Sequence, residues 1–192
     1  SMNYGWNPEY ESFRNEVRDF IRELKTPELM AELGRGEEAA MGSNAATKKI
    51  RDALDSRGWI KMCWPEEYGG QGKSAWYQFI LAEELTLAEL PYGRGTASMI
   101  GPAIQRFGSE EQKAKYLPQI WSGDMTLALG YSEPNAGTDL ASLETMASKD
   151  GDDWIINGQK VWTSGAHVST HVWLAARTDP DAPKHRGISM FI

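Results

Sequence analysis

The chain has 192 residues, 41% of them hydrophobic, and a formal net charge of −7. This composition suffices for a sizeable core and argues against disorder, while the length fits one large domain or two small ones. The negative charge disfavours nucleic acid and anionic membranes as partners, and no apolar run approaches the ~18 residues of a membrane span. With Cys63 as the only cysteine and no signal-peptide pattern, a reducing, cytoplasmic location is expected.

The first part of the chain has the periodicity of helices. Between residues 9 and 24, apolar side chains recur at helical spacing and form one stripe. A second helix is expected from the cap-like Asn44, and Ser109 with Gln112 forms a capping box that starts another, which should end before Pro118. The predicted helices cover residues 9–24, 44–58, 74–90, 95–108 and 109–117.

The pattern changes to strands after Asp124. Residues 125–132, 170–177 and 187–192 are short apolar runs, and residues 154–162 are predicted to form a hairpin with Asn157-Gly158 as a type I′ turn. Helices therefore precede strands instead of alternating with them. This order predicts an α+β fold, with a helical domain over residues 1–124 and a β domain over residues 125–192.

Several common site motifs are absent from the sequence. No G-x-G-x-x-G opens a helix after a strand, no phosphate-binding P-loop is present, and no G-x-S-x-G marks a nucleophile. The glycine-rich residues 69–72 lie between helices and are predicted to form a tight turn. His167, His171 and His185 lack ligand spacing, so no metal site is expected.

Two loops rich in hydroxyl groups remain, residues 129–142 and residues 160–167. Each follows an apolar run and combines hydroxyls with an aromatic side chain, which is Tyr131 in the first and Trp162 in the second. A flat heterocycle with polar edges would suit such loops, since aromatic rings cover its faces and hydroxyls bond its edge. The alternative is an ordinary pair of polar loops in which Trp162 is a core aromatic. The residues alone leave both interpretations open.

Five segments resemble the acyl-CoA dehydrogenase family closely and in the family's order. They are "WPEEYGGQG" at 64–72, "ILAEELTLAELP" at 80–91, "FGSEEQKAKYLPQIWSGD" at 107–124, "YSEPNAGTDLAS" at 131–142 and "INGQKVWTSGA" at 156–166. The last two resemble the family's flavin-contacting segments. The resemblance implies an N-terminal helical domain followed by a β-barrel-like middle domain, and it covers nearly the whole chain.

What the resemblance implies chemically is a flavoprotein oxidoreductase of fatty acid and lipid metabolism. FAD would be bound noncovalently, and an acyl-CoA thioester would be dehydrogenated to a trans-2-enoyl-CoA. A catalytic glutamate would remove the α-proton, and the β-hydrogen would leave as hydride. Electrons would pass to an electron-transferring flavoprotein, and the family's assembly is a homotetramer.

The resemblance also assigns roles to individual residues. Ser132 replaces the family's usual Thr and keeps a hydroxyl for the flavin's pyrimidine edge, and Ser164 replaces a Thr whose hydroxyl approaches N5. Thr138 replaces a Ser near the pyrophosphate and the CoA thioester arm, while Asn135 stands where the family prefers Gly. The expected cofactor-binding residues are Leu129, Gly130, Tyr131, Ser132, Thr138, Trp162, Thr163 and Ser164, and the expected substrate-binding residues are Ser132, Thr138 and Met99, with Ile100 and Gly101 also candidates for the acyl wall.

The catalytic base has no candidate in this sequence. By resemblance it belongs to a C-terminal helical domain, which is expected to be absent here, so the β domain is expected to be truncated and its last strand to have an unpaired edge. Glu83 and Glu84 are interpreted as a solvated or ion-paired helix face, and Glu133 as a residue that shapes its loop. The chain alone is therefore expected to be inactive.

Other functions stay open at this point. The chain could be a noncatalytic subunit that binds flavin or acyl-CoA and needs a complementary chain. It could belong to a relative with altered chemistry, such as an acyl-CoA oxidase or a flavin-dependent monooxygenase. It could also be a helical scaffold without any ligand.

Overall fold

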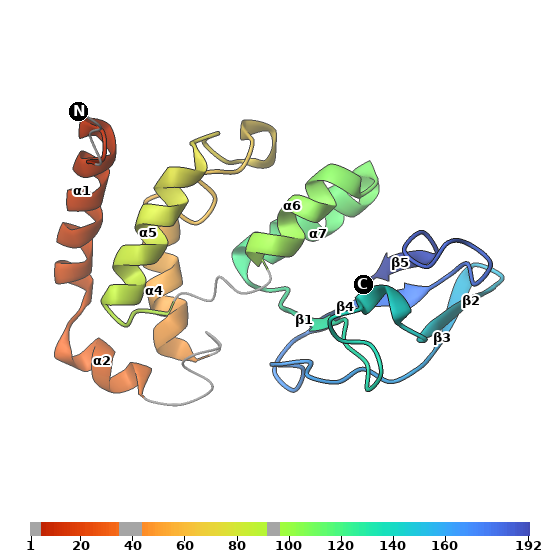
Figure 1. The fold of residues 1–192 in the computed structure, drawn as a ribbon. Coiled ribbons are helices and arrows are strands. Elements are labelled where there is room, and N and C mark those ends of the chain that lie inside the picture. Colours follow the sequence, from red (N-terminus) through yellow and green to blue (C-terminus); the bar gives the residue numbers. More distant parts are fainter. Residues whose placement is uncertain (1–4, 35–43, 92–96) are drawn as a thin grey trace. The chain divides into compact units, whose positions relative to one another are not determined.

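A computed structural model describes residues 5–34, 44–91 and 97–192, which form two compact units, residues 1–95 and 96–192 (Figure 1). The first unit is helical, and the second contains two helices and a five-stranded sheet. The change from helix to strand occurs inside the second unit, at residue 127. The boundary between the two compact units therefore lies earlier in the chain than the change from helix to strand.

The first unit consists of α1 (Pro8–Leu24), α2 (Pro27–Leu33), α4 (Ala45–Ser56), the 3-10 turn η1 (Glu66–Tyr68) and α5 (Ala75–Leu87). Side-chain caps start α1 and α4, since Asn7 accepts a hydrogen bond from the Tyr10 amide and Asn44 accepts one from the Thr47 amide. The helices predicted over 9–24, 44–58 and 74–90 are confirmed. The short helix α2 was not predicted, although Thr26 caps it and Pro27 begins it.

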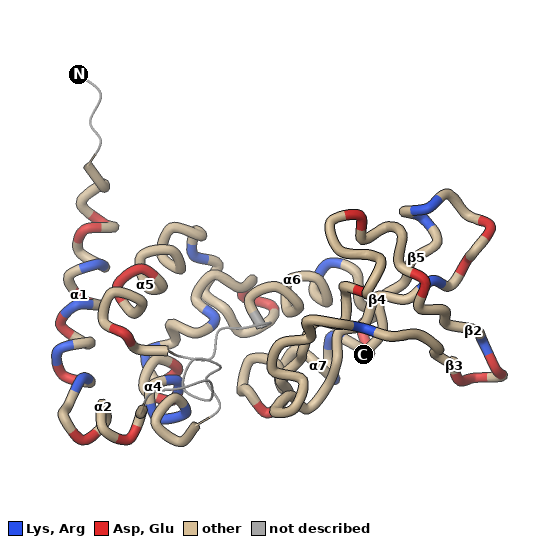
Figure 2. Tube along the Cα trace, turned by 60° about the horizontal axis from the view of Figure 1, so that its bottom comes forward, with Lys and Arg blue, Asp and Glu red and all other residues tan. Residues whose placement is uncertain are grey.

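The apolar stripe of α1 packs against α5 and α4 to form the core of this unit. Val17 on α1, Ile50 on α4 and Leu81 on α5 are all completely buried. The stripe predicted from helical spacing is therefore the core face, and α1 and α5 lie side by side (Figure 1). Acidic and basic residues are interspersed along the trace of α1 (Figure 2).

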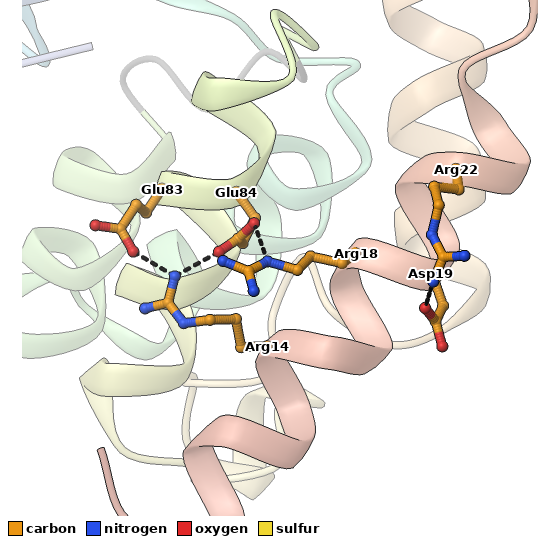
Figure 3. A network of polar contacts seen from close by, with 6 residues as sticks. All are labelled: Arg14, Arg18, Asp19, Arg22, Glu83 and Glu84. Carbon is orange, nitrogen blue, oxygen red and sulfur yellow. Dashed lines mark hydrogen bonds and ion pairs between the residues drawn. The ribbon is translucent and has the colours of Figure 1, made fainter. Parts of the chain in front are cut away.

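Across the packed faces of α1 and α5 runs an ion-pair network (Figure 3). Arg14 Nη1 donates to Glu83 Oε2 at 2.5 Å and also to Glu84, and Arg18 Nε donates to Glu84 Oε2 at 2.9 Å. Burial by itself raises the pKa of Glu84, but the hydrogen bonds from Arg18 and Arg14 outweigh it and leave that pKa below its ordinary value. The carboxylate therefore stays charged in the core of the unit.

The second unit begins with α6 (Ala97–Phe107) and α7 (Glu110–Ser122). The capping box of Ser109 and Gln112 is confirmed at the start of α7, but the expected end before Pro118 is wrong. The helix continues through Pro118 and ends at Gly123, which has a left-handed conformation. One lost main-chain hydrogen bond is tolerated because Leu117 and Ile120 are buried on either side of the proline. Residues 95 and 96 of the predicted helix 95–108 lie outside the described residues.

The sheet contains β1 (Leu127–Gly130), β2 (Met146–Asp150), β3 (Asp153–Asn157), β4 (His171–Arg177) and β5 (Ile188–Phe191). The central strand β4 pairs in parallel with β1 and, at one residue, with β2, while β5 pairs with β4 in antiparallel register. Three of these strands confirm the runs predicted at 125–132, 170–177 and 187–192. Among the described strands β5 pairs only with β4, and the sheet is not closed.

The predicted hairpin around Asn157-Gly158 is wrong. The hairpin joins β2 to β3 instead, with Asp150 opposite Asp153 and Gly151 in a left-handed conformation at its charged tip (Figure 2). Gly158 serves a different purpose, because a Cβ there would lie 2.2 Å from Thr145 Oγ1. The residues after it, 158–170, form a long loop and not a strand. No helix in the described part of the chain is long and apolar enough to cross a membrane.

Candidate functional site

The first predicted loop leaves the sheet at Gly130, the last residue of β1. Gly130 is opposite Leu174 of β4, and a Cβ at this position would lie 2.8 Å from Val172 Cγ1 and 3.0 Å from Leu174 Cδ1. A glycine is therefore required for β1 to approach the side chains of β4. Leu129, one residue earlier, is paired with Trp173 and is half-buried. The start of the loop is thus fixed by the sheet.

A tight turn follows at residues 133–136. The Glu133 amide donates to Ala136 O at 2.9 Å, and the Ala136 amide donates back to Glu133 O at 3.1 Å. Pro134 and Asn135 occupy the exposed centre of this turn. Asn135 stands where the family prefers Gly, but it is not left-handed, because Glu89 and Trp162 are the non-glycine residues with positive φ in the described ranges.

Glu133 is the anchor of the loop. Its side chain is buried, and its two carboxylate oxygens accept hydrogen bonds from the Glu144 amide at 2.6 Å, the Thr145 amide at 2.9 Å and Lys160 Nζ at 2.9 Å. Burial alone raises the pKa of this carboxyl, but these donors on residues 144, 145 and 160 outweigh it and lower the pKa to about 2. A carboxylate held in this way shapes the loop, as the sequence analysis interpreted it, and is too weak a base to remove a proton.

The second predicted loop is bound directly to the first. Lys160 Nζ also donates to Tyr131 O at 2.9 Å, and the Val161 amide donates to Ser132 O at 2.9 Å. The structure thus brings together Tyr131 and Ser132 of the first loop with the residues immediately before Trp162 of the second. Lys160 was not predicted as a site residue. A lysine in a loop otherwise rich in hydroxyls could have indicated a buried carboxylate partner.

Trp162 has an unusual conformation and an unusual environment. Its φ is +59°, and its side chain is 88% exposed. The interpretation of Trp162 as a core aromatic is therefore wrong for this structure. A bulky residue with positive φ costs of order 1–3 kcal/mol, and such strain is concentrated at ligand sites. An exposed indole held in this way offers an aromatic face to a flat ligand.

The neighbouring hydroxyls complete the second loop. Thr163 Oγ1 is buried and has no hydrogen-bond partner within the described structure, whereas Ser164 is exposed. The Ser164 amide donates to Trp162 O at 2.9 Å, and Gly165 follows with a φ of +76°. A buried hydroxyl without a partner is costly, so a ligand atom that bonds to Thr163 would remove a penalty.

Two other predicted site residues, Thr138 within the first loop and Met99 on α6, make no hydrogen bond of their own to the residues described above, within the described parts of the chain. Thr138 is exposed, and Met99 is 53% exposed. Ile100, next to Met99, is completely buried and belongs to the core of its unit. Arg177 fixes the end of the first loop by donating from Nη2 to Ala141 O at 2.7 Å.

None of the three candidate carboxylates is available as a base, and no metal cluster accompanies them. Glu83 and Glu84 are ion-paired to Arg14, and Glu133 is ion-paired to Lys160. Within the residues that the structure describes, no group of three or more His, Cys, Asp or Glu side chains could hold a metal ion. The candidate site therefore offers aromatic, hydroxyl and main-chain groups, the kinds of group that can orient a bound ligand.

Comparison with known proteins gives a relative and two solved structures that match this arrangement. The acyl-CoA dehydrogenase FadE26 of Mycobacterium tuberculosis is 42% identical over 194 residues, which are 100% of this chain and 48% of that protein. The structure of the ChsE4-ChsE5 complex from Mycobacterium tuberculosis has a TM-score of 0.83 and 42% identity over 100% of this chain and 48% of the other. The Tcur3481-Tcur3483 steroid ACAD has a TM-score of 0.84 and 42% identity, covering 98% and 48% of the two chains.

The family assignment follows from both halves of the sequence. The chain spans about half the length of the curated relatives that it matches. The profile of the acyl-CoA dehydrogenase N-terminal domain matches residues 7–124, and that of the acyl-CoA dehydrogenase middle domain matches residues 128–192. With both profiles in the expected order and the two hydroxyl-rich loops bound together, the chain belongs to the acyl-CoA dehydrogenase family.

Proposed function

We propose that this chain supplies the flavin-binding segments for FAD-dependent α,β-dehydrogenation of an acyl-CoA thioester. The observation that carries the proposal is the main-chain hydrogen bond between Ser132 and Val161, which places the first loop beside the strained, exposed Trp162. Two loops far apart in the sequence thus present an indole face and several hydroxyls in one region. FAD, when bound, supplies the hydride acceptor that this chemistry needs.

The side chains present are compatible with a flavin ring. Trp162 provides an uncovered aromatic face, and Thr163 provides a buried hydroxyl that lacks a partner. We infer that Ser132, Ser164 and Thr163 bond the polar edge of the ring and that Trp162 packs against its face. In this proposal, the polar edge of the flavin ring lies against Leu129 and Gly130 at the end of β1. Binding by these groups is a matter of orientation and exclusion of water, because none of them titrates near neutral pH.

The proton acceptor has to come from elsewhere. Glu83, Glu84 and Glu133 are held in ion pairs, so each would have to lose a partner before it could accept a proton from substrate. The relatives continue well beyond the length of this chain, and we propose that the base is carried by the corresponding part of the whole protein or by a second chain. Thr138 and Met99 are proposed to contact the acyl-CoA, and the electron acceptor is proposed to be an electron-transferring flavoprotein.

A second candidate function is a subunit that works only with a different dehydrogenase chain. The likeness to the ChsE4-ChsE5 complex favours it over a homotetramer, since that structure contains two differently named chains. The likeness to a steroid ACAD suggests, by the same reasoning, that the acyl group includes a steroid skeleton. An acyl-CoA oxidase or a flavin-dependent monooxygenase remains distinguishable by its use of oxygen in place of a protein acceptor.

The visible absorption spectrum tests the flavin proposal directly. The chain is incubated with FAD, desalted and scanned, and a resolved band near ~450 nm is expected if the two loops hold the ring. Absence of retained flavin from a chain with intact helical circular dichroism, both alone and after mixing with a candidate second chain, would contradict the proposal. Anaerobic loss of that band on addition of an acyl-CoA, seen only with the second chain present, would establish the two-chain form.

A further inference from the structure

We propose that Glu133 and Lys160 form a positioning pair that sets the Trp162–Ser164 segment against Ser132. The proposal rests on the flavin site proposed above, and it assigns to this buried ion pair a role in ligand binding in addition to stability. Neither residue is proposed to touch the substrate, so both act through the segments that they hold.

Main-chain hydrogen bonds hold the carboxylate of Glu133 independently of Lys160. Both of its oxygens accept main-chain hydrogen bonds, from the Glu144 amide at 2.6 Å and from the Thr145 amide at 2.9 Å. These amides directly precede β2, so the carboxylate is anchored to the start of a strand. The tight turn between Glu133 and Ala136 fixes the main chain of the same residue. Glu133 is therefore a rigid acceptor on the framework of the sheet.

Lys160 converts that anchor into a fixed position for the second loop. Its Nζ lies 2.9 Å from Glu133 Oε1 and 2.9 Å from Tyr131 O, and its side chain is 11% exposed. The next amide, on Val161, donates to Ser132 O at 2.9 Å. Two successive residues of the second loop are thus bound to two successive residues of the first. The strained Trp162 follows Val161 directly.

A close main-chain contact supports the same alignment from the other side. A Cβ at Gly158 would lie 2.2 Å from Thr145 Oγ1 and 2.7 Å from Thr145 Cα, so only glycine lets the chain pass there. Gly158 therefore lies directly against Thr145, one of the two residues whose amides hold Glu133. Shape restrains the path of the second loop at Gly158, and charge restrains it at Lys160.

The environment of Trp162 shows why the pair acts on the site. The indole gains little from its own packing, because it is 88% exposed, yet its main chain has a φ of +59°. A strained conformation persists only where the surrounding structure determines it. The Lys160 and Val161 contacts are the restraints adjacent to it. Without them, the segment is expected to relax toward ordinary φ values and move the Trp162 face and the Thr163 hydroxyl.

Lys160→Met tests the pair, and Arg14→Met is the matched control. Each change removes a buried cation from a buried glutamate that keeps other donors, Glu133 in one case and Glu84 in the other, and the two glutamate side chains are equally exposed at 7%. Both variants are expected to lower the unfolding temperature. Only Lys160→Met is expected to weaken FAD binding, by about tenfold or more, because small displacements of positioning groups have large effects. Lys160→Arg, which keeps the cation, is expected to restore most of the affinity.

Hydrogen exchange without ligand provides a readout independent of the flavin. Faster exchange of the amides at residues 161–165 in Lys160→Met, but not in Arg14→Met, supports the pair even if the chain itself retains no FAD, in which case only the proposed function fails. Unchanged exchange at 161–165, or equal losses of FAD affinity in the two methionine variants, would overturn it. If Lys160→Met does not fold, Lys160→Gln, which keeps a hydrogen-bond donor, is compared with Arg14→Gln by the same two measurements and the same criteria.

Discussion

The Val161 amide donates to Ser132 O at 2.9 Å, and this hydrogen bond joins two loops that leave different strands. Ser132 follows β1, and Val161 follows β3 in the chain, but neither residue belongs to a strand. A main-chain contact of this kind is insensitive to the side chains at either residue. The loop arrangement at this contact therefore does not depend on which side chain stands at residue 132.

Replacing Trp162 with glycine separates ligand binding from folding. The change removes an exposed side chain and relieves a positive φ, so the free energy of unfolding should change by less than about 1 kcal/mol. FAD retention should fall sharply, because the ring face is lost. Thermal unfolding and flavin titration measure the two effects. Trp76→Ala, at an indole that is 52% exposed on α5, is the control and should leave flavin retention unchanged.

Thr163→Val addresses the buried hydroxyl that lacks a partner. The substitution keeps the branched shape and removes Oγ1, so the ligand-free protein should be equally stable or more stable by up to about 1 kcal/mol. In the presence of FAD that order should reverse if the hydroxyl bonds the flavin. Unfolding temperatures measured with and without FAD give the answer. If Thr163→Val without FAD loses as much stability as a core substitution does, the hydroxyl already has a partner in the ligand-free protein.

Local signals in the sequence predicted most of the helices and strands. Features that depend on contacts between residues distant in the chain were not predicted. Helix caps such as Asn44 and the box at Ser109 depend on neighbours a few residues away, and both are confirmed. The hairpin was predicted at the wrong place because Asn157-Gly158 has the composition of a type I′ turn. In the structure, residue 158 has to be glycine because a Cβ there would collide with Thr145. No pattern within a short window contains that contact.

The site was predicted unevenly for the same reason. The two hydroxyl-rich loops were evident from composition, and the structure joins them through Ser132 and Val161. The left-handed conformation of Trp162 and the partner of Lys160 could not be read from the sequence, since both depend on the fold of segments that are distant in the chain. The continuation of α7 through Pro118 likewise depends on burial of Leu117 and Ile120, which outweighs one missing hydrogen bond.

Gly130→Ala tests whether close packing at the end of β1 supports the site. The added Cβ would lie 2.8 Å from Val172 Cγ1 and 3.0 Å from Leu174 Cδ1, so the strand or those side chains must shift. The expected loss of stability is about 1–3 kcal/mol, with weaker flavin retention as the loop moves. Gly137→Ala is the control, because nothing lies within 4 Å of a Cβ at that position. Equal stability of the two alanine variants in urea denaturation would refute the packing argument.

Glu84→Gln should destabilise the first unit. It leaves Arg14 and Arg18 without the charge that both contact (Figure 3), and the side chain of Arg14 is only 8% exposed. Arg14 keeps its ion pair with Glu83 and Arg18 is half exposed, so the expected cost is that of a buried donor that loses one partner, about 1–3 kcal/mol. Asp19→Asn removes the exposed partner of Arg22 on the same helix and should cost less than about 0.5 kcal/mol. Chemical denaturation of both variants measures the difference.

The lowered pKa of Glu133 predicts a specific dependence of stability on acid. The carboxyl has a pKa of about 2 in the folded protein, against an ordinary value of 4.5, so the unfolded chain takes up its proton first as the pH falls. The contribution of Glu133 is therefore fully present above pH 4.5 and is lost progressively as the pH falls toward about 2. Glu133→Gln should be less stable at neutral pH and should lose less stability on acidification than the unsubstituted chain. Urea denaturation measures the free energy of unfolding of both proteins at each pH. If the two plots of this free energy against pH are parallel between these values, Glu133 is not held in its charged form. In the folded protein the carboxylate stays ionised until the pH approaches about 2, so Lys160 and the two amides should hold the Trp162 segment through most of this acid range even as the stability that Glu133 provides declines.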